Sequence, residues 1–347
     1  MTQAAQAPEL GAALEAGQLA LGQGPWQHGL RRLRRNRPAM IALAVFAVIV
    51  AVSLLAPLYA GRVAHTDPFN SNISGTTIVD GKKVDVLQQS AGLGLGVAPI
   101  GPTWDVRHFF LGADNEGRDV LARVLYGGRA SLIIAFGAAL ASLLIATGLA
   151  LVAGFFRGLI DSVISRLMDM LWAFPVFLLA ILIATVSLTQ GLKIGPVNVD
   201  PGSLLLPIVI IAMIFVPYAY RPIRSQVLAV RERDFVKAAI VEGASTRWLI
   251  FREILPNVAT TVLVLLPLMI ALDILVESGL SFLGIGVQPP QASWGTIIAN
   301  GQGLIYSRSW VAVAPGLMIL LTVLSLNVLG DGIRDALDPR AKLRIEA

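Results

Sequence analysis

Asp234–Asn257, DFVKAAIVEGASTRWLIFREILPN, is a polar stretch that lies between two apolar runs, Leu204–Tyr220 and Val258–Leu272. Each run is long enough to cross a bilayer. A connection between two membrane helices needs only a few residues. Because this one is far longer than a connection requires, we expect it to have a role of its own.

The spacing of residues within the stretch predicts two short helices. Gly243 is expected to end the first helix, Ser245 to cap the second, and Pro256 to close the unit before the next span. Small side chains followed by a glycine let another protein approach the backbone closely, and the charged flanks limit how far it slides. The expected contact face has members three and four residues apart: Phe235, Ala238, Ala239 and Glu242.

The order Lys237-Ala238-Ala239, three further residues, Gly243 and later Leu255-Pro256 resembles the cytoplasmic EAA loop of ABC importer permeases. Lys237 stands where that pattern has Glu, and Glu253 where it has Ile. The resemblance implies that the loop docks into an ATP-binding subunit and passes its motion to the membrane domain. From this stretch alone, an ordinary amphipathic surface loop is the alternative.

On this resemblance, residues of the loop take three roles. The docking surface would consist of Phe235, Ala238, Ala239, Gly243 and Ala244. The charges that orient it would be Arg231, Glu232, Asp234, Glu242 and Arg247. Pro256 would make the joint rigid enough to transmit force.

The composition indicates an integral membrane protein. The 347 residues are 55% hydrophobic and 14% charged, with a mean hydropathy of +0.73, whereas soluble domains carry about a quarter charged residues. The absence of cysteine excludes disulfides, thiolate metal sites and cysteine nucleophiles. The three histidines, His28, His65 and His108, are too scattered to predict a metal site.

Six apolar runs predict an all-α membrane protein with six transmembrane helices. The expected spans are 39–59, 130–156, 170–188, 204–220, 258–278 and 310–330. The corresponding regions are a cytoplasmic tail (1–38), the first transmembrane helix (39–60), an extracytoplasmic loop with an interfacial helix (61–128), a core (129–330) containing the loop 221–257, and a cytoplasmic tail (331–347). The first 30 residues lack apolar periodicity and are interpreted as a mobile tail.

The distribution of Lys and Arg predicts the orientation. These residues gather in the N-terminal tail, the turn 157–169, the loop 221–257 and the C-terminal tail, whereas the opposite links 189–203 and 279–309 contain only Lys193 and Arg308. By the positive-inside rule both termini and the loop 221–257 are expected in the cytoplasm. The arginines of 31–37 are therefore interpreted as holding the start of the first span in the cytoplasm rather than as a nucleic-acid-binding arm.

Residues 111–132, LGADNEGRDVLARVLYGGRASL, predict an interfacial helix that leads into a span. Val120, Leu121, Val124 and Leu125 form its apolar face, and nearby arginines are expected to reach lipid headgroups. The stretch resembles a signature of the peptide and nickel branch of ABC permeases, with Ala113 in place of the usual Thr. Residues 154–181, 281–295 and 331–340 resemble the same branch.

These resemblances imply a type I ABC importer permease in a bacterial or archaeal cytoplasmic membrane. The implied partners are a second homologous permease, two ABC ATPase subunits, an extracytoplasmic substrate-binding protein and membrane lipid. GLGLGV at 92–97 and Gly81-Lys82-Lys83 lack the spacing of nucleotide-binding loops. ATP and Mg are therefore expected on the partner ATPases, with no cofactor on this chain and no catalytic residues.

Three further residues are candidates for the pathway. Asp273 and Glu277 are carboxylates within the fifth span, where such groups mark functional or paired sites. Pro175 is expected to kink the third span around a pathway, or is simply tolerated in a packed bundle. An ion-gradient-driven secondary transporter that uses Asp273 and Glu277 is the alternative function, and a membrane enzyme is a second.

Overall fold

The structure is a computed structural model that describes residues 25–337, apart from 80, 90–95 and 195–196. Most of the expected N-terminal tail, residues 1–24, lies outside this part, as do the last ten residues. Residues 25–35, which we interpreted as tail, form helix α2. The fold is mostly helical.

Within this part of the chain, five helices are long and apolar enough to cross a membrane, or six if one bent pair is a single span. The helices are α2 (Pro25–Arg35), α3 (Arg37–Leu54), α4 (Ala56–Leu58), α5 (Val120–Phe156), α6 (Gly158–Ala173), α7 (Val176–Gln190), α8 (Leu205–Arg231), α9 (Asp234–Val241), α10 (Thr246–Trp248), α11 (Leu255–Phe282), α12 (Trp294–Gly301) and α13 (Trp310–Leu337). Short π-helical turns follow α4 (Tyr59–Val63) and α10 (Leu249–Ile254), and a 3-10 turn follows α12 (Gln302–Leu304).

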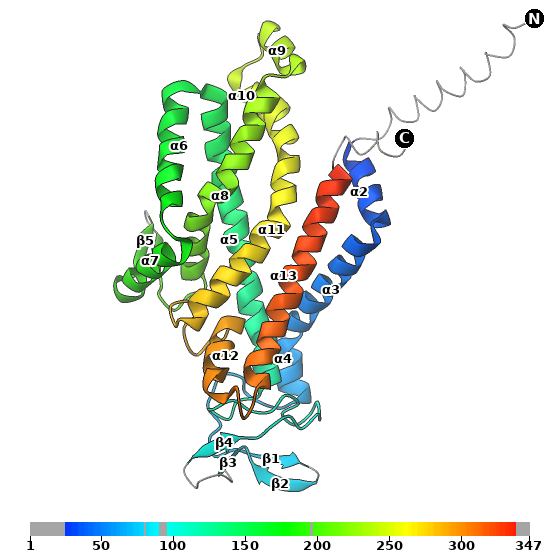
Figure 1. Cartoon of the computed structure of the whole chain (residues 1–347), viewed down its shortest axis with the longest axis vertical. Helices are drawn as coiled ribbons and strands as arrows, with labels where there is room; N and C mark the ends of the chain where they lie inside the picture. Colours follow the sequence, from blue (N-terminus) through cyan, green and yellow to red (C-terminus); the bar gives the residue numbers. More distant parts are fainter. Residues whose placement is uncertain (1–24, 80, 90–95, 195–196, 338–347) are drawn as a thin grey trace, which may run out of the picture.

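The fold is not purely helical, because three two-stranded antiparallel sheets occupy the links between spans in the residues that the structure describes. Strands β1 (Thr76–Val79) and β2 (Lys82–Asp85) form one pair, and β3 (Leu87–Gln89) and β4 (Val97–Pro99) form another. A third pair, β5 (Leu192–Ile194) and β6 (Val197–Val199), follows α7. Figure 1 shows β1–β4 at one end of the helix bundle and α9 at the other.

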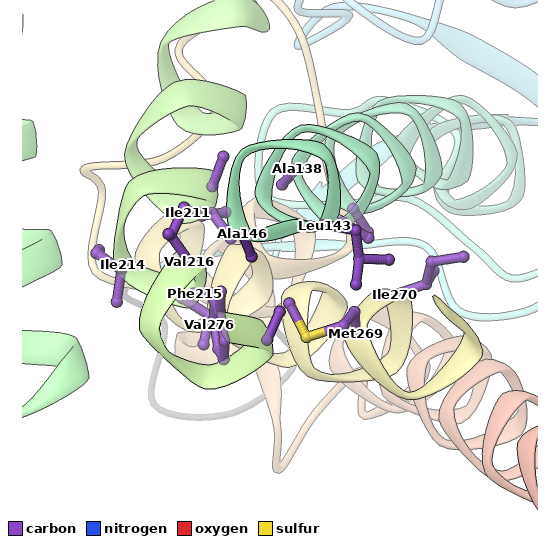
Figure 2. Packing of buried hydrophobic residues seen from close by; sticks show 14 of the residues in the cluster. Ala138, Leu143, Ala146, Ile211, Ile214, Phe215, Val216, Met269, Ile270 and Val276 are labelled. Atoms are coloured by element: carbon purple, nitrogen blue, oxygen red, sulfur yellow. The ribbon is translucent and has the colours of Figure 1, made fainter. Parts of the chain in front are cut away.

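Helix α5 is the centre of the bundle and packs against α8 and α11. Its small residues allow close approach: Ala138 and Ala146 are fully buried, and a side chain at Gly154 would lie 2.6 Å from Val227 on α8. Figure 2 shows labelled apolar side chains of α5, α8 and α11 where these helices pack together, among them Leu143, Ile211 and Met269. The many Ala and Gly residues of the second span permit this close packing between helices.

The third span differs from the prediction. Residues 157–169, expected to be a short charged turn, belong to helix α6, and α6 and α7 meet at an angle of 90°. The break falls at Phe174 and Pro175, both with extended backbone. A proline lacks the N–H for a helical hydrogen bond and disfavours the helical conformation of the residue before it. Pro175 therefore ends the helix rather than kinking it.

Two helices run further than predicted. The expected interfacial helix and the second span form one 37-residue helix, α5, which begins after the N-cap Asp119. The fifth span also begins early, because a helical run continues from Thr246 to Phe282. Pro256 therefore does not end the docking unit. It lies in the first turn of α11, just after the π-helical turn, and a proline is tolerated in a first helical turn.

Candidate functional site

The first candidate site is the unit Asp234–Pro256, which projects from the end of the bundle at α8 and α11 (Figure 1). On α9, Phe235, Ala238 and Glu242 are exposed, as expected of a contact face. Ala239 is only 8% exposed and packs inward with Val236. The outward face is widened by Ile240 and Val241, which are 49% and 88% exposed.

Gly243 ends helix α9 because its backbone conformation is one that other residues rarely adopt. Its φ is +83°, in the left-handed region, and a side chain built there would meet nothing within 4 Å. The Ala244 N–H donates to the carbonyl of Ala239 across this turn, which is the geometry of a helix C-terminus. Ser245 then caps α10 by accepting from the Trp248 N–H. The helix–glycine–cap order predicted from the sequence is confirmed.

Exposed apolar side chains continue past the turn. Trp248 is 41% exposed and Phe251 is 66% exposed, whereas Leu249 and Ile254 are buried against the bundle. Ala244 is half-buried and Arg247 is exposed. Large apolar side chains grouped on a polar, charged segment mark an interaction surface.

Glu232 joins this unit to the α5–α6 junction. Its carboxylate accepts a hydrogen bond from Arg157 Nη2 at 2.5 Å and lies 3.7 Å from Lys237 Nζ on α9. Arg231 lies at 4.0 Å from the same carboxylate, and its guanidinium stands over the Phe155 ring. The hydrogen bond from Arg157 lowers the pKa of Glu232. Each of these exposed ion pairs contributes little to stability. Together they hold the docking unit in a fixed orientation relative to the α5–α6 junction.

Asp234 is exposed in the first turn of α9. A carboxylate there is favoured by the positive end of the helix dipole. Arg233 precedes it as the N-cap without a side-chain capping bond. The acidic residue thus stabilises the start of the docking helix whatever its partner.

The second candidate site surrounds Glu277, which is fully buried where α5, α11 and α12 meet. Its two carboxylate oxygens accept hydrogen bonds from Ser131 Oγ at 2.8 Å and Ser281 Oγ at 2.7 Å. The backbone N–H of Trp294 donates in turn to Ser131 Oγ at 3.2 Å. A fully partnered carboxylate of this kind holds helices together, which is a packing role for Glu277.

Asp273 lies one helical turn from Glu277 and differs from it. It is fully buried, and neither of its carboxylate oxygens has a hydrogen-bond partner among the described residues. No arginine in this part of the chain pairs with it, and the surrounding side chains of the same chain bury it completely. An unpartnered buried carboxylate is expensive, which is the pattern of a functional residue.

A third cluster of charged side chains lies at the start of α5. The sequence did not predict that these side chains would meet. Asp114 Oδ2 accepts from Arg118 Nε at 2.9 Å and lies 3.4 Å from Arg123 Nε, and Arg123 Nη1 donates to the Pro68 carbonyl at 2.9 Å. Arg118 and Arg123 are among the arginines near 111–132 that we expected to reach headgroups. They are almost fully buried, so that prediction is wrong for these two. These contacts attach the polar segment before β1 to the start of α5.

The residues that surround Glu277 were also missed. Ser131, Ser281 and Trp294 lie inside stretches that resemble the branch signatures, but nothing in the sequence brings them together. Helix α12 was not predicted either. The sequence feature that could have predicted this helix is the pair Ser293 and Thr296, which form a capping box at its start. Within the described part of the chain, no cluster of three or more His, Asp or Glu side chains has the arrangement of a metal site.

Comparison with known proteins identifies the family. A family model described as the binding-protein-dependent transport system inner membrane component matches residues 129–343. A second, described as the N-terminal TM domain of oligopeptide transport permease C, matches residues 24–76.

Whole-chain relatives agree with these matches. The chain is 34% identical to a dipeptide transport system permease protein of Alkalihalophilus pseudofirmus over 92% of its length and 91% of that protein. It is 33% identical to an oligopeptide transport system permease protein of Haemophilus influenzae (92% and 90% covered). It is 38% identical to a di/tripeptide transport system permease protein of Pseudomonas aeruginosa (70% and 76% covered). The family consists of transport permeases, and no catalytic function is indicated. The chain therefore belongs to the family of inner-membrane components of binding-protein-dependent transport systems.

Proposed function

We propose that the chain is the permease subunit of an ATP-driven importer of di- or oligopeptides or related small solutes, and that Asp234–Pro256 couples it to an ATPase. The observation that carries this proposal is the projecting α9 unit, whose outward side chains include Phe235 and Val241, which are 39% and 88% exposed within the described part of the chain. The relatives are named as peptide transport permeases, which supports the cargo class.

The orientation follows from charge. The end of the molecule that carries α9 also carries α2 with its arginines (Figure 1), and this sign of charge is retained in the cytoplasm. Both termini then lie in the cytoplasm, and β1–β4 lie outside. We expect two ATPases below, a second homologous permease alongside and a substrate-binding protein at the outer end.

Force passes from the docking unit to the membrane through continuous helix. The run from Thr246 to Phe282 connects the docking surface to Asp273 and Glu277 without a break, so a displacement at one end tilts the other. Glu232 ties the same unit to the α5–α6 junction through Arg157. Closure of the ATPases on ATP then shifts the permease between inward-facing and outward-facing states, each stabilised by different partner contacts.

ATP and Mg are bound by the partner ATPases in this proposal. This chain contributes no catalytic residue, and its part is mechanical. The pathway candidates are Asp273 and the sharp break at Pro175. Glu277 supports them as a packing residue.

The test is to place a charge in the docking surface of the assembled transporter. Val241→Glu should abolish copurification of the ATPases and ATP-dependent peptide uptake while the chain still inserts in the membrane. Ile78→Glu is the matched control, because Ile78 is 52% exposed on β1 at the opposite end. Normal ATPase recovery with Val241→Glu and its loss with Ile78→Glu would reverse the orientation.

Secondary transport remains the alternative, and the observation that favours it is the unpartnered carboxylate of Asp273. Uptake by vesicles that contain this chain without any ATPase, driven by an ion gradient, would establish it. Uptake that requires ATP and the ATPases would refute it.

A further inference from the structure

Helix α2 carries a one-sided arginine surface. With 3.6 residues per turn, Gly29 and Leu33 lie on one side of the helix and Arg31, Arg34 and Arg35 on the other. Gly29 packs against Leu337, and Leu33 lies beside Gly332, both on the end of α13. The arginine side is exposed. Packing on α13 therefore fixes the direction in which the guanidinium groups point.

The guanidinium groups form a patch of one sign. Four of them, Arg31, Arg32, Arg34 and Arg35, line a single hollow, and Arg37 follows at the start of α3. Within the described residues, no carboxylate forms an ion pair with Arg31, Arg34, Arg35 or Arg37, although Asp331 and Asp335 lie on the neighbouring α13.

A patch of positive charge of this kind favours the binding of an anion. Like charges three and four residues apart destabilise a helix. The negative end of the helix dipole offsets this only in part. An anion bound among the guanidinium groups would remove the repulsion.

The position of α2 identifies the anion. Helix α3, which follows directly, is the least buried of the five unbroken candidate spans, and Ile41, Val48 and Leu54 are more than half exposed. Figure 1 shows α2 and α3 at the edge of the molecule, away from α6 and α7. The 18 residues of α3 measure about 27 Å, close to the apolar thickness of a bilayer. A helix with such an apolar outer face lies against lipid, and the arginines before it then lie at the level of the headgroups.

We infer that the arginine face of α2 is a binding site for the phosphate groups of anionic phospholipids. A guanidinium donates two parallel hydrogen bonds to a phosphate. Arg31 and Arg35 lie one turn apart, about 6 Å along the axis, and so reach the same or adjacent headgroups. Clusters of four or more basic residues at the end of a span bind anionic lipid in this way. The bound lipid holds α2 in place. Because Gly29 and Leu33 pack against the end of α13, the lipid holds that end in place as well. The inference needs only that α3 spans a membrane, and it stands apart from the proposed cargo and ATPases.

The test measures the lipid that the full-length chain retains in its complex. The complex is reconstituted with phosphatidylglycerol and phosphatidylethanolamine, purified in mild detergent, and the ratio of the two retained lipids is measured. R31Q/R34Q/R35Q should lower the preference for phosphatidylglycerol by roughly a hundredfold at low salt, since each cation near an anionic surface contributes about a factor of five to six. R31K/R34K/R35K keeps the charge and should retain most of the preference.

The control removes the same number of exposed cations at the other end of the bundle. R62Q/K83Q/R107Q should leave the lipid ratio unchanged. Equal ratios for the wild type and R31Q/R34Q/R35Q would overturn the inference.

A second arm treats the lipid-free wild-type complex with trypsin, which cleaves after arginine. Phosphatidylglycerol vesicles should protect residues 31–37, and phosphatidylcholine vesicles should not. Equal protection by inorganic phosphate alone would assign the site to a free anion and overturn the lipid assignment.

Discussion

Glu277 on α11 accepts a hydrogen bond of 2.8 Å from the hydroxyl of Ser131 on α5, a residue 146 positions earlier in the chain. The same carboxylate accepts from Ser281, and Ser131 accepts from the Trp294 N–H. One buried side chain thus holds three helices together.

The first prediction concerns this junction. Glu277→Gln keeps an acceptor for the serines and should lower the free energy of unfolding by only about 1 kcal/mol. Glu277→Ala leaves the hydroxyl groups without their acceptor and opens a cavity, so it should cost roughly 3 kcal/mol. Tryptophan fluorescence during thermal unfolding of the purified chain measures both. A Glu277→Gln chain of normal stability that no longer transports would contradict the packing role.

A second prediction separates two reasons for Gly243. Its φ of +83° disfavours any side chain, but the space around it is open. Asn tolerates this conformation far better than Val does. Gly243→Asn should therefore retain the turn and most ATP-dependent uptake, whereas Gly243→Val should abolish uptake with insertion unchanged. Equal loss with both variants would mean that the partner ATPase requires the absence of a side chain.

How much the sequence reveals depends on the range of the interaction. The span positions, the turn at Gly243 and the cap at Ser245 are local, and periodicity with capping chemistry predicts them. The charges Asp161 and Asp169 suggested a turn, but they lie on α6 and pair with Arg224 and Arg221 on α8, more than fifty residues away. Pairing at that distance along the chain has no local signal. The burial of Arg123 was missed for the same reason.

A third prediction concerns acid stability. Asp119 caps α5 by accepting from the Ala122 N–H, and burial raises the pKa of its carboxyl group to about 6. The folded form therefore favours the protonated acid. Stability is greatest below the unfolded pKa of about 4 and falls as the pH rises to about 6, by roughly 3 kcal/mol in all. Asp119→Asn keeps the cap and removes the titration. Its unfolding temperature should vary less between pH 4 and 6 than that of the wild type, and an identical pH profile would contradict this account.

The β1–β2 and β3–β4 pairs support a fourth prediction. The 61–110 segment is longer than a simple link, and it is clamped to the bundle where Arg308 Nε donates to the Pro99 carbonyl and Trp104 packs edge-on against Trp310. We expect the β1–β2 hairpin to contact the substrate-binding protein. Replacing residues 76–85 by a short Gly-Ser linker should weaken binding of that protein at least tenfold while the ATPases remain bound. Unchanged binding in a pull-down with the purified binding protein would refute the contact.

The last prediction tests whether Asp273 is retained for function at the expense of stability. Both of its oxygens lack partners within the described chain and the side chain is fully buried, so removing the carboxylate should stabilise the fold by about 1–3 kcal/mol. Asp273→Asn is nearly isosteric, and Asp273→Ala also removes the polar group. We expect higher unfolding temperatures with slower ATP-driven uptake, because a costly buried group without a structural partner is kept for its part in the transport cycle. The control is Ser325→Ala on α13, which is also buried and should leave uptake unchanged. A destabilised Asp273→Asn chain with normal uptake would show instead that the carboxylate has a structural partner, and it would remove Asp273 from the pathway.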